Sequence, residues 1–303
     1  MNNTSPNISR LRQRIREETY KALGVTKSRF WRMMAHPLIA LPTHRFAEVG
    51  ANFDYQVSKS NFSKAARWVL PTFVSKIDIV GQENIPSEGP LLITSNHPGI
   101  SDALVIAASI PRDDLKIIAG SLPFLKGMPN ASEHFLYVDG DTLSKFAVIR
   151  KAIRHLWDGG SVLIFASGRL DPDPACLPGA DAAIKDWSRS LEIMLRKAPK
   201  TKLLPTIVKG VLRNDFARNP FAQFGQTVRD RQRIAEFIQV MWQMLFPHSG
   251  LAKPEVLYGS PLQLDSLGSQ ERVIDTITRK ARQLLKANPS SSRVEMPIFP
   301  AKN

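Results

Sequence analysis

The most constraining feature of the sequence is an alternation that begins after Pro71. Short β-branched or leucine-rich runs alternate with longer segments whose apolar residues recur every three or four positions. The short runs are bounded by Gly and Pro and are expected to be strands: residues 77–80, 91–94, 116–119, 135–138, 162–166, 203–209 and 255–258. The segments with helical spacing are residues 102–110, 144–157, 181–196, 229–246 and 270–286. This alternation predicts an α/β fold with a mostly parallel or mixed central sheet covered by helices.

The chain is expected to have three parts, since its 303 residues suit one large domain with a terminal appendage. Residues 76–287 form the expected α/β domain, and residues 288–303, which contain a proline and a serine run, are expected to be a flexible tail. Residues 1–75 are expected to be a basic amphipathic helical region facing a membrane, because Phe30 and Trp31 lie among many arginines. The alternative is that these helices pack on their own domain.

The charge of the chain indicates a polyanionic partner. Its 41 Lys and Arg residues outnumber 27 Asp and Glu residues, for a net charge of +14. Nucleic acid and an anionic membrane surface both suit this charge, but no helix-turn-helix, zinc-finger or aromatic RNA-binding signature is present. No apolar run reaches the ~18 residues of a spanning helix, and the first residues do not resemble a secretory signal. We expect a cytoplasmic protein bound peripherally to an anionic membrane, with no nucleic-acid partner.

Disulfide and metal chemistry are not indicated. Cys176 is the only cysteine, so no intramolecular disulfide can form. It lies among prolines, and we expect it to be a bystander in a loop rather than a nucleophile. His134, His155 and His248 have no partners at metal-ligand spacing, so we expect no metal. Residues 159–160, a Gly-Gly pair before an expected strand, are typical of a turn rather than of a dinucleotide-binding loop.

The most informative segment is the loop that follows the expected strand at residues 91–94. The apolar run ends at Asn96 and His97, turns at a Pro-Gly pair and restarts as a helix near Asp102. A turn brings two side chains five positions apart close together, and a carboxylate bound to one imidazole nitrogen leaves the other free to take a proton. The alternative is that Asp102 or Ser101 caps the helix and that His97 is an ordinary loop residue.

The residues around this loop show a family resemblance. Residues 81–86 (Gly-Gln-Glu-Asn-Ile-Pro) and residues 88–102, which end in Asn-His-Pro-Gly-Ile-Ser-Asp, resemble the opening block of the glycerolipid acyltransferases with an Asn-His-x4-Asp signature, such as the 1-acylglycerol-3-phosphate acyltransferases. Residues 161–170, 204–208 and 254–261 are similar to later blocks, so the resemblance covers about residues 76–287.

The resemblance implies transfer of a fatty acyl chain from an acyl-CoA or acyl-carrier-protein thioester to the hydroxyl, or amine, of a lipid-like acceptor. The thioester is a co-substrate, and no cofactor is expected. His97 would be the general base and Asp102 the residue that orients it. The residues expected to bind substrate are Asn96, Gly99, Ser167, Gly168, Arg169 and Pro205.

Two blocks depart from the family pattern. Where phosphate-binding members have Gly-x-x-Phe-Ile-x-Arg, this chain has acidic Asp139 and Asp141, and where they have Phe-Pro-Glu-Gly-Thr-Arg it has Phe-Ala-Ser-Gly-Arg-Leu-Asp from residue 165. An aspartate in place of arginine repels a phosphate, so the identity of the acceptor stays open. Asp139 and Asp141 would select a cationic or sugar-like head group, or lie in a turn at Gly140. The alternative function is a catalytically retired lipid-binding or acyl-binding protein with the same fold.

Overall fold

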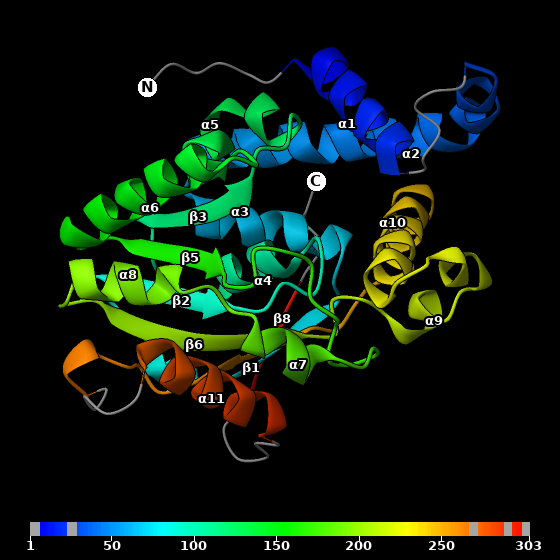
Figure 1. Ribbon diagram of the computed structural model, residues 1–303. Coiled ribbons are helices and arrows are strands. Elements are labelled where there is room, and N and C mark those ends of the chain that lie inside the picture. Colours follow the sequence, from blue (N-terminus) through cyan, green and yellow to red (C-terminus); the bar gives the residue numbers. More distant parts are fainter. Residues whose placement is uncertain (1–6, 23–28, 267–271, 288–292, 299–303) are drawn as a thin grey trace.

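The computed structural model describes residues 7–22, 29–266, 272–287 and 293–298, and an eight-stranded sheet forms its centre (Figure 1). The strands are β1 (Lys76–Val80), β2 (Leu91–Ser95), β3 (Leu115–Gly120), β4 (Phe135–Val138), β5 (Ser161–Phe165), β6 (Lys202–Lys209), β7 (Glu255–Tyr258) and β8 (Arg293–Pro297). Their order is β4-β3-β5-β2-β6-β7-β1-β8, and the pairs β6–β7 and β1–β8 are antiparallel while the others are parallel. The predicted mixed sheet is confirmed.

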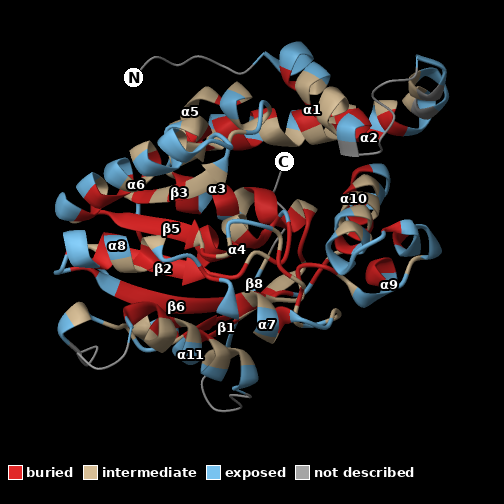
Figure 2. Ribbon diagram, in the orientation of Figure 1, coloured by how far each residue is buried: buried red, intermediate tan, exposed pale blue. Residues whose placement is uncertain are grey.

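Helices cover both faces of this sheet. They are α1 (Ile8–Ala22), α2 (Arg29–Lys59), α3 (Phe62–Val69), α4 (Asp102–Ser109), α5 (Pro129–Ser132), α6 (Thr142–Trp157), α7 (Ala180–Lys185), α8 (Ser190–Lys197), α9 (Asn214–Ala217), α10 (Val228–Leu245) and α11 (Val273–Lys286). Short 3-10 turns are η1 (Leu70–Thr72), η2 (Gln82–Asn84), η3 (Leu125–Gly127), η4 (Pro220–Phe224) and η5 (Leu264–Ser266). One core layer joins the sheet to α2, α3, α4 and α10, and the other joins it to α6, α8 and α11 (Figure 2).

The helices α1, α2 and α3 are packed against the α/β domain through one face. Leu11, Phe53 and Phe62 are buried and belong to the same core layer as the sheet. The carboxylate of Asp54 accepts hydrogen bonds from the backbone N–H of Ala131 (2.8 Å) and thereby ties α2 to α5. For these buried faces the alternative of packing on the domain is correct. Within the described ranges, no helix combines the length and apolar character that crossing a bilayer requires.

The expectation of one helix over residues 181–196 is wrong, because the chain breaks into α7 and α8. Between them the ring of Trp187 is buried in the core, with 4% of its surface exposed. The backbone N–H of Ser188 donates to the carbonyl oxygen of Ala166, just after β5 (2.8 Å). The buried Trp187 ring and the hydrogen bond from Ser188 to Ala166 stabilise the break more than a continuous helix over these residues would.

The expected loose tail is also partly wrong. Arg293–Pro297 forms β8, an edge strand antiparallel to β1, although most of its side chains are exposed. The ammonium group of Lys76 contacts the carboxylate of Glu295 (2.7 Å), and Arg293 forms an ion pair with Glu255. Backbone hydrogen bonds and cross-strand ion pairs hold this strand in place. Neither produces a hydrophobic pattern in the sequence, so the strand was not predicted. Residues 270–271 of the last expected helix and the serine run before β8 lie outside the described residues.

Candidate active site

The site begins where β2 ends. All five residues of β2 are buried between neighbouring strands. The side-chain amide of Asn96 then continues the pairing with β6, since its Nδ2 donates to the carbonyl oxygen of Val208 (2.8 Å) and its Oδ1 accepts from the backbone N–H of Val208 (2.9 Å). The Asn96 side-chain amide thus makes the two hydrogen bonds that the backbone of one further strand residue would make. The loop that carries His97 therefore starts from a fixed point in the centre of the sheet.

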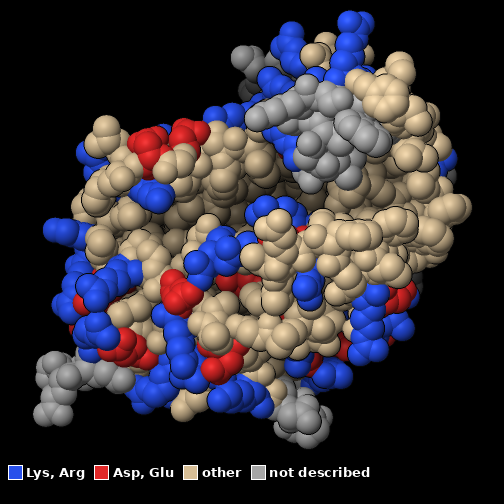
Figure 3. Space-filling model, turned by 45° about the vertical axis from the view of Figure 1, so that its right-hand side comes forward, with Lys and Arg blue, Asp and Glu red and all other residues tan. Residues whose placement is uncertain are grey.

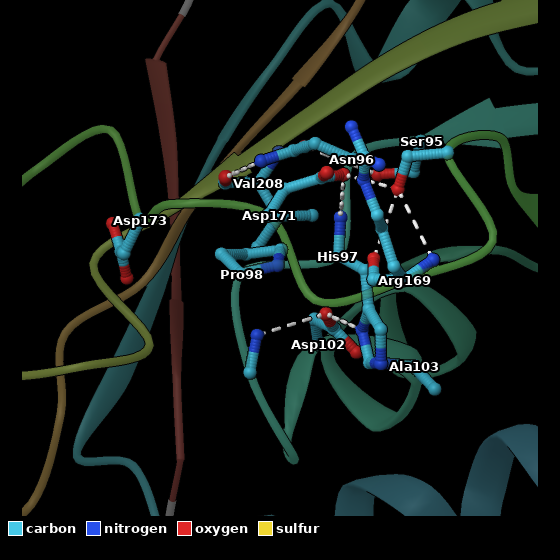
Figure 4. Close-up of polar contacts among 12 residues, drawn as sticks. Ser95, Asn96, His97, Pro98, Asp102, Ala103, Arg169, Asp171, Asp173 and Val208 are labelled. Atoms are coloured by element: carbon cyan, nitrogen blue, oxygen red, sulfur yellow. Dashed lines mark hydrogen bonds and ion pairs between the residues drawn. The ribbon is translucent and has the colours of Figure 1, made fainter. Parts of the chain in front are cut away.

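His97 and Asp102 are brought together by the turn between them (Figure 4). Nδ1 of His97 lies 2.7 Å from Oδ2 of Asp102, whose side chain is 1% exposed. The same carboxylate accepts from the backbone N–H groups of Gly99 (3.2 Å) and Ala103 (2.6 Å). Ser101 occupies the N-cap position of α4 without a side-chain hydrogen bond, and Asp102 is the first helical residue. Asp102 thus orients the imidazole rather than capping the helix.

A second carboxylate holds the backbone of His97. Oδ2 of Asp171 accepts from the backbone N–H of His97 (3.0 Å) and from the hydroxyl of Ser167 (2.9 Å). The ring of Phe165 stacks on the imidazole, with the centroids 4.4 Å apart. The following loop is fixed in turn by Asp173, which accepts backbone N–H groups, including that of Leu212 (2.9 Å). Sequence reasoning missed Asp171 and Asp173, although an Asp-Pro-Asp run soon after a family block was a usable signal.

The helix α10 supplies the remaining polar contacts of the loop. Nε2 of Gln232 donates to the carbonyl oxygens of Pro98 (2.7 Å) and Asp171 (2.9 Å). Oε1 of Glu236 would lie 3.4 Å from a Cβ atom at Gly99, and a methyl carbon of Val211 would lie 2.9 Å from it. Gly99 suits this position because a side chain there would crowd Glu236 of α10 and Val211 of the segment after β6. Nothing in the sequence marked Gln232 or Glu236, because α10 is more than a hundred positions from the loop.

The charges around His97 change its acidity. Burial lowers the pKa of the imidazole, but the neighbouring carboxylate of Asp102, with smaller effects of Glu236 and Asp171, outweighs burial and raises the pKa to about 9. Burial raises the pKa of Glu236 to about 8, against the hydrogen bond from Gln232 and the attraction of His97. Burial also raises the pKa of Asp171. One imidazole is thus surrounded by three carboxyl groups.

His97 lies in the wall of a cavity of about 980 Å³. Apolar side chains form most of its walls: Leu11 and Ile15 of α1, Phe46, Val49 and Phe53 of α2, Phe62 of α3, and Ile117, Phe135 and Ile149 from β3, β4 and α6. In Figure 3 the hollow has tan walls, with Lys and Arg atoms at its floor and edge. The two N-terminal helices therefore line the same cavity as the imidazole.

The structure brings together most of the expected site residues. His97, Gly99, Asp102, Ser167, Gly168 and Arg169 all line the cavity. Asn96 and Pro205 do not, because Asn96 is turned to β6 and Pro205 is buried within that strand. The guanidinium group of Arg169 forms an ion pair with Asp186.

Two further expectations are resolved by local contacts. The carboxylate of Asp141 caps α6 by accepting from the backbone N–H of Ser144 (2.8 Å), which is the turn alternative, and Asp139 faces Lys126 at 3.9 Å. The thiol of Cys176 lies 3.7 Å from the carbonyl oxygen of Leu212, and burial beside acidic neighbours raises its pKa to about 12. Such a thiol is a poor nucleophile, as its interpretation as a bystander implies.

Comparison with known proteins defines the class. Residues 76–206 match the family model described as Acyltransferase, and this segment contains β1 to β5, the His97–Asp102 pair and the loop with Asp171. Residues 76–206 are therefore similar to the acyltransferase family over its matched domain, and the protein is an acyltransferase enzyme. The resemblance inferred from the sequence is confirmed at the level of this family.

Among solved structures, the chain is similar to the crystal structure of the 1-acyl-sn-glycerophosphate (LPA) acyltransferase PlsC from Thermotoga maritima. The two are 16% identical, the match covers 93% of this chain and 97% of that chain, and the TM-score is 0.47. No curated protein matches the chain.

Proposed function

We propose that this protein transfers a fatty acyl chain from an acyl-CoA or acyl-carrier-protein thioester to a hydroxyl or amine of a lipid-like acceptor at a membrane surface. The observation that carries the proposal is the placement of the His97–Asp102 pair in the wall of a largely apolar cavity. A proton acceptor beside a groove for an alkyl chain suits acyl transfer, since each buried methylene of the chain contributes about 0.8 kcal/mol to binding.

In the proposed reaction, neutral His97 takes the proton of the acceptor O–H on Nε2, while Nδ1–H donates to Asp102. The acceptor oxygen attacks the thioester carbonyl carbon and forms a tetrahedral oxyanion, which backbone donors or Arg169 stabilise. The C–S bond then breaks, the carbonyl is restored, and the imidazolium returns its proton to the thiolate. The products are the acylated acceptor and the free thiol, and His97 ends the cycle neutral.

Attachment to an anionic membrane is part of the same proposal. Large apolar side chains of α2 are exposed near its start, at Phe30, Met33, Met34, Leu38 and Leu41, and near its end at Tyr55. Residues 1–60 contain ten basic and four acidic residues. Basic residues near an anionic bilayer contribute roughly 1 kcal/mol each, which together with inserted apolar side chains supports reversible binding. The side chain of Trp31, also expected to insert, lies outside the described residues.

The test is thiol release from a long-chain acyl-CoA and from an acyl-carrier protein, with a panel of lysolipid, phosphate-bearing, sugar and amine acceptors. We expect release that depends on one acceptor class and falls on the order of 10²–10⁴-fold in His97→Ala, with the vesicle binding of the protein unchanged. Native-rate release by His97→Ala would refute His97 as the base. Absence of His97-dependent release with every donor would favour a lipid-binding protein without catalysis.

A further inference from the structure

A pair of phenylalanines stands out on the surface beside α10. Phe221 and Phe224 of η4 are 68% and 79% exposed, and their ring centroids lie 6.5 Å apart. Large apolar side chains this exposed, side by side, mark surfaces that bind another apolar phase. Neither ring lines the cavity, and η4 lies outside residues 76–206, so the family match leaves this feature without a role.

The backbone beneath the two rings is firmly held. Oδ1 of Asn219 accepts from the backbone N–H of Phe221 (3.0 Å), and the intervening Ala222 is fully buried. The side chain of Gln223 donates to the carbonyl oxygen of Ala217 (3.0 Å), and that of Arg231 donates to the carbonyl oxygen of Gly225 (3.0 Å). The turn is therefore built to present the rings outward, because its own polar groups are satisfied from within.

The charge around the rings suits an anionic surface. Residues 213–233 contain five basic residues (Arg213, Arg218, Arg229, Arg231 and Arg233) and two acidic ones (Asp215 and Asp230). Arg213 is engaged with Asp215, and Nε of Arg229 donates to the carbonyl oxygen of Leu170 (3.2 Å). Arg218 and Arg229, which precede and follow the two phenylalanines in the sequence, are both exposed. Exposed aromatic rings flanked by arginines match the interface of a bilayer, where apolar groups enter among the acyl chains and cations meet lipid phosphates.

The position of η4 relates it to the active site and to α2. The helix α10, which follows η4, lines the cavity through Arg233 and Glu236. At its other end, the guanidinium group of Arg45 in α2 donates to the carbonyl oxygen of Met244 (2.8 Å). The helices α2, α10 and α9 lie along the same side of the molecule in Figure 1, and that side presents a broad uncharged surface in Figure 3. Since η4 packs against α10, it lies on the same side of the molecule as α2.

We propose that η4 and the start of α10 form a second lipid-docking surface, in which Phe221 and Phe224 insert into an anionic bilayer while Arg218 and Arg229 contact its phosphates. This proposal rests on the proposed function only in that the acceptor is drawn from a membrane. Two contacts, α2 and η4, would fix the orientation of the molecule on the bilayer, and α10 would hold the cavity near the lipid.

The test is cosedimentation of the full-length protein with phosphatidylcholine vesicles containing 30% phosphatidylglycerol, and with pure phosphatidylcholine vesicles. Phe221→Ser/Phe224→Ser should weaken binding to the anionic vesicles roughly tenfold to a hundredfold, and Arg218→Gln should weaken it several-fold at low salt only. The matched control is Trp157→Ser, which removes a ring that is 66% exposed before the turn into β5, at the opposite end of the strands. Its binding should equal that of the native protein.

Three outcomes would overturn the proposal. They are native-like binding by the double variant, an equal loss in Trp157→Ser, and a native dimer in light scattering that the double variant dissociates, which would make the surface an interface between copies. Thermal melting and thiol release from octanoyl-CoA to a water-soluble acceptor of the active class, without vesicles, serve as folding and activity readouts, and both should be unchanged in the double variant. Failure of the proposed function would show in the native protein as absent thiol release, which is independent of vesicle binding.

Discussion

His97 and Asp171 hold each other by two hydrogen bonds, one in each direction. The backbone N–H of His97 donates to the carboxylate of Asp171 (3.0 Å), and the backbone N–H of Asp171 donates to the carbonyl oxygen of His97 (2.8 Å). The loop after β2 and the loop after β5 are thereby joined at the residue that carries the imidazole. Together with the contact of the ring to Asp102, this leaves His97 fixed through both its side chain and its backbone.

Asp171→Ala should weaken both the fold and the reaction. It leaves the backbone N–H of His97 without its side-chain acceptor, while the hydroxyl of Ser167 keeps the carbonyl oxygen of Arg169 (2.9 Å), at a cost of about 1–3 kcal/mol in the free energy of unfolding. Displacement of the loop should lower kcat up to roughly 100-fold. Urea unfolding and acyl-transfer kinetics measure the two effects. Asp171→Asn keeps one acceptor oxygen and should lie between Ala and the native protein, and an Ala variant equal to native in both assays would show the link to be dispensable.

Asp102→Asn should abolish most turnover while substrate binding is retained. An amide that donates to Nδ1 of His97 would favour the tautomer with a proton on Nε2, which cannot accept one from the substrate. We expect kcat to fall on the order of 10²–10⁴-fold. Asp141→Asn is the control, because asparagine also caps α6 well and the residue does not line the cavity. A fall in Asp141→Asn of the same size would reopen the role of that acid in acceptor binding.

The pH dependence of the reaction should follow the neutral fraction of His97. Because the surrounding carboxylates raise its pKa to about 9, the imidazole is protonated at neutral pH, and kcat/KM should rise with pH up to about 9. Glu236→Gln removes one negative charge beside the ring, so it should lower this pKa and move the rising limb toward lower pH. The limb is read from pH–rate profiles of the two proteins. A limb that does not move would mean that Glu236 does not act on His97 electrostatically.

The same pKa shift makes the stability of the fold depend on pH in a defined direction. The pKa of His97 is higher in the folded protein than the ordinary value of 6.5, so its protonation favours the folded state. This contribution is fully present below pH 6.5 and is lost as pH rises through about 9. Urea unfolding at pH 6 and pH 9.5 should show a smaller pH dependence in His97→Ala than in the native protein, and an identical dependence would contradict the linkage.

Asn96→Ala should destabilise the centre of the sheet. The substitution leaves the backbone N–H and carbonyl groups of Val208 without partners, at roughly 1–3 kcal/mol for each group that water cannot reach. Asn96→Asp is an informative comparison, since it keeps an acceptor for the N–H but places a carboxylate oxygen against the carbonyl oxygen. Both variants should unfold at lower urea concentrations than the native protein. An unchanged urea midpoint for Asn96→Ala would show that the hydrogen bonds between Asn96 and Val208 do not stabilise the sheet.

Gly50→Leu should shift donor preference toward shorter acyl chains. Gly50 of α2 lines the cavity, and a Cβ atom there would lie 3.4 Å from a methyl carbon of Leu11 and 3.5 Å from the sulfur of Met128. A methyl group fits at these distances, whereas a larger side chain must occupy cavity space. The measurement is kcat/KM across acyl-CoA chain lengths, with Gly50→Ala as the control. An unchanged profile for Leu would mean that the acyl chain does not lie along α2.

The sequence alone determined strands β1 to β7 and the loop with His97 and Asp102. Hydrophobic runs of strand length and a Pro-Gly turn act over a few residues, and β2 is buried on both faces as its continuous apolar run predicts. The distance between His97 and Asp102 is short because only that turn separates them. Each of these features depends on neighbours in the chain, so the local pattern was sufficient.

The tertiary structure decided everything that depends on distant segments. Gln232 and Glu236 reach the loop from α10, Asp171 reaches it from the loop after β5, and α1 and α2 line the cavity. The break between α7 and α8 and the pairing of β8 with β1 also arise from contacts with the sheet. Packing and hydrogen bonding between segments far apart in the chain produce no recurring pattern of residues, so the sequence alone does not reveal them. These contacts set the pKa of His97 and the shape of its cavity.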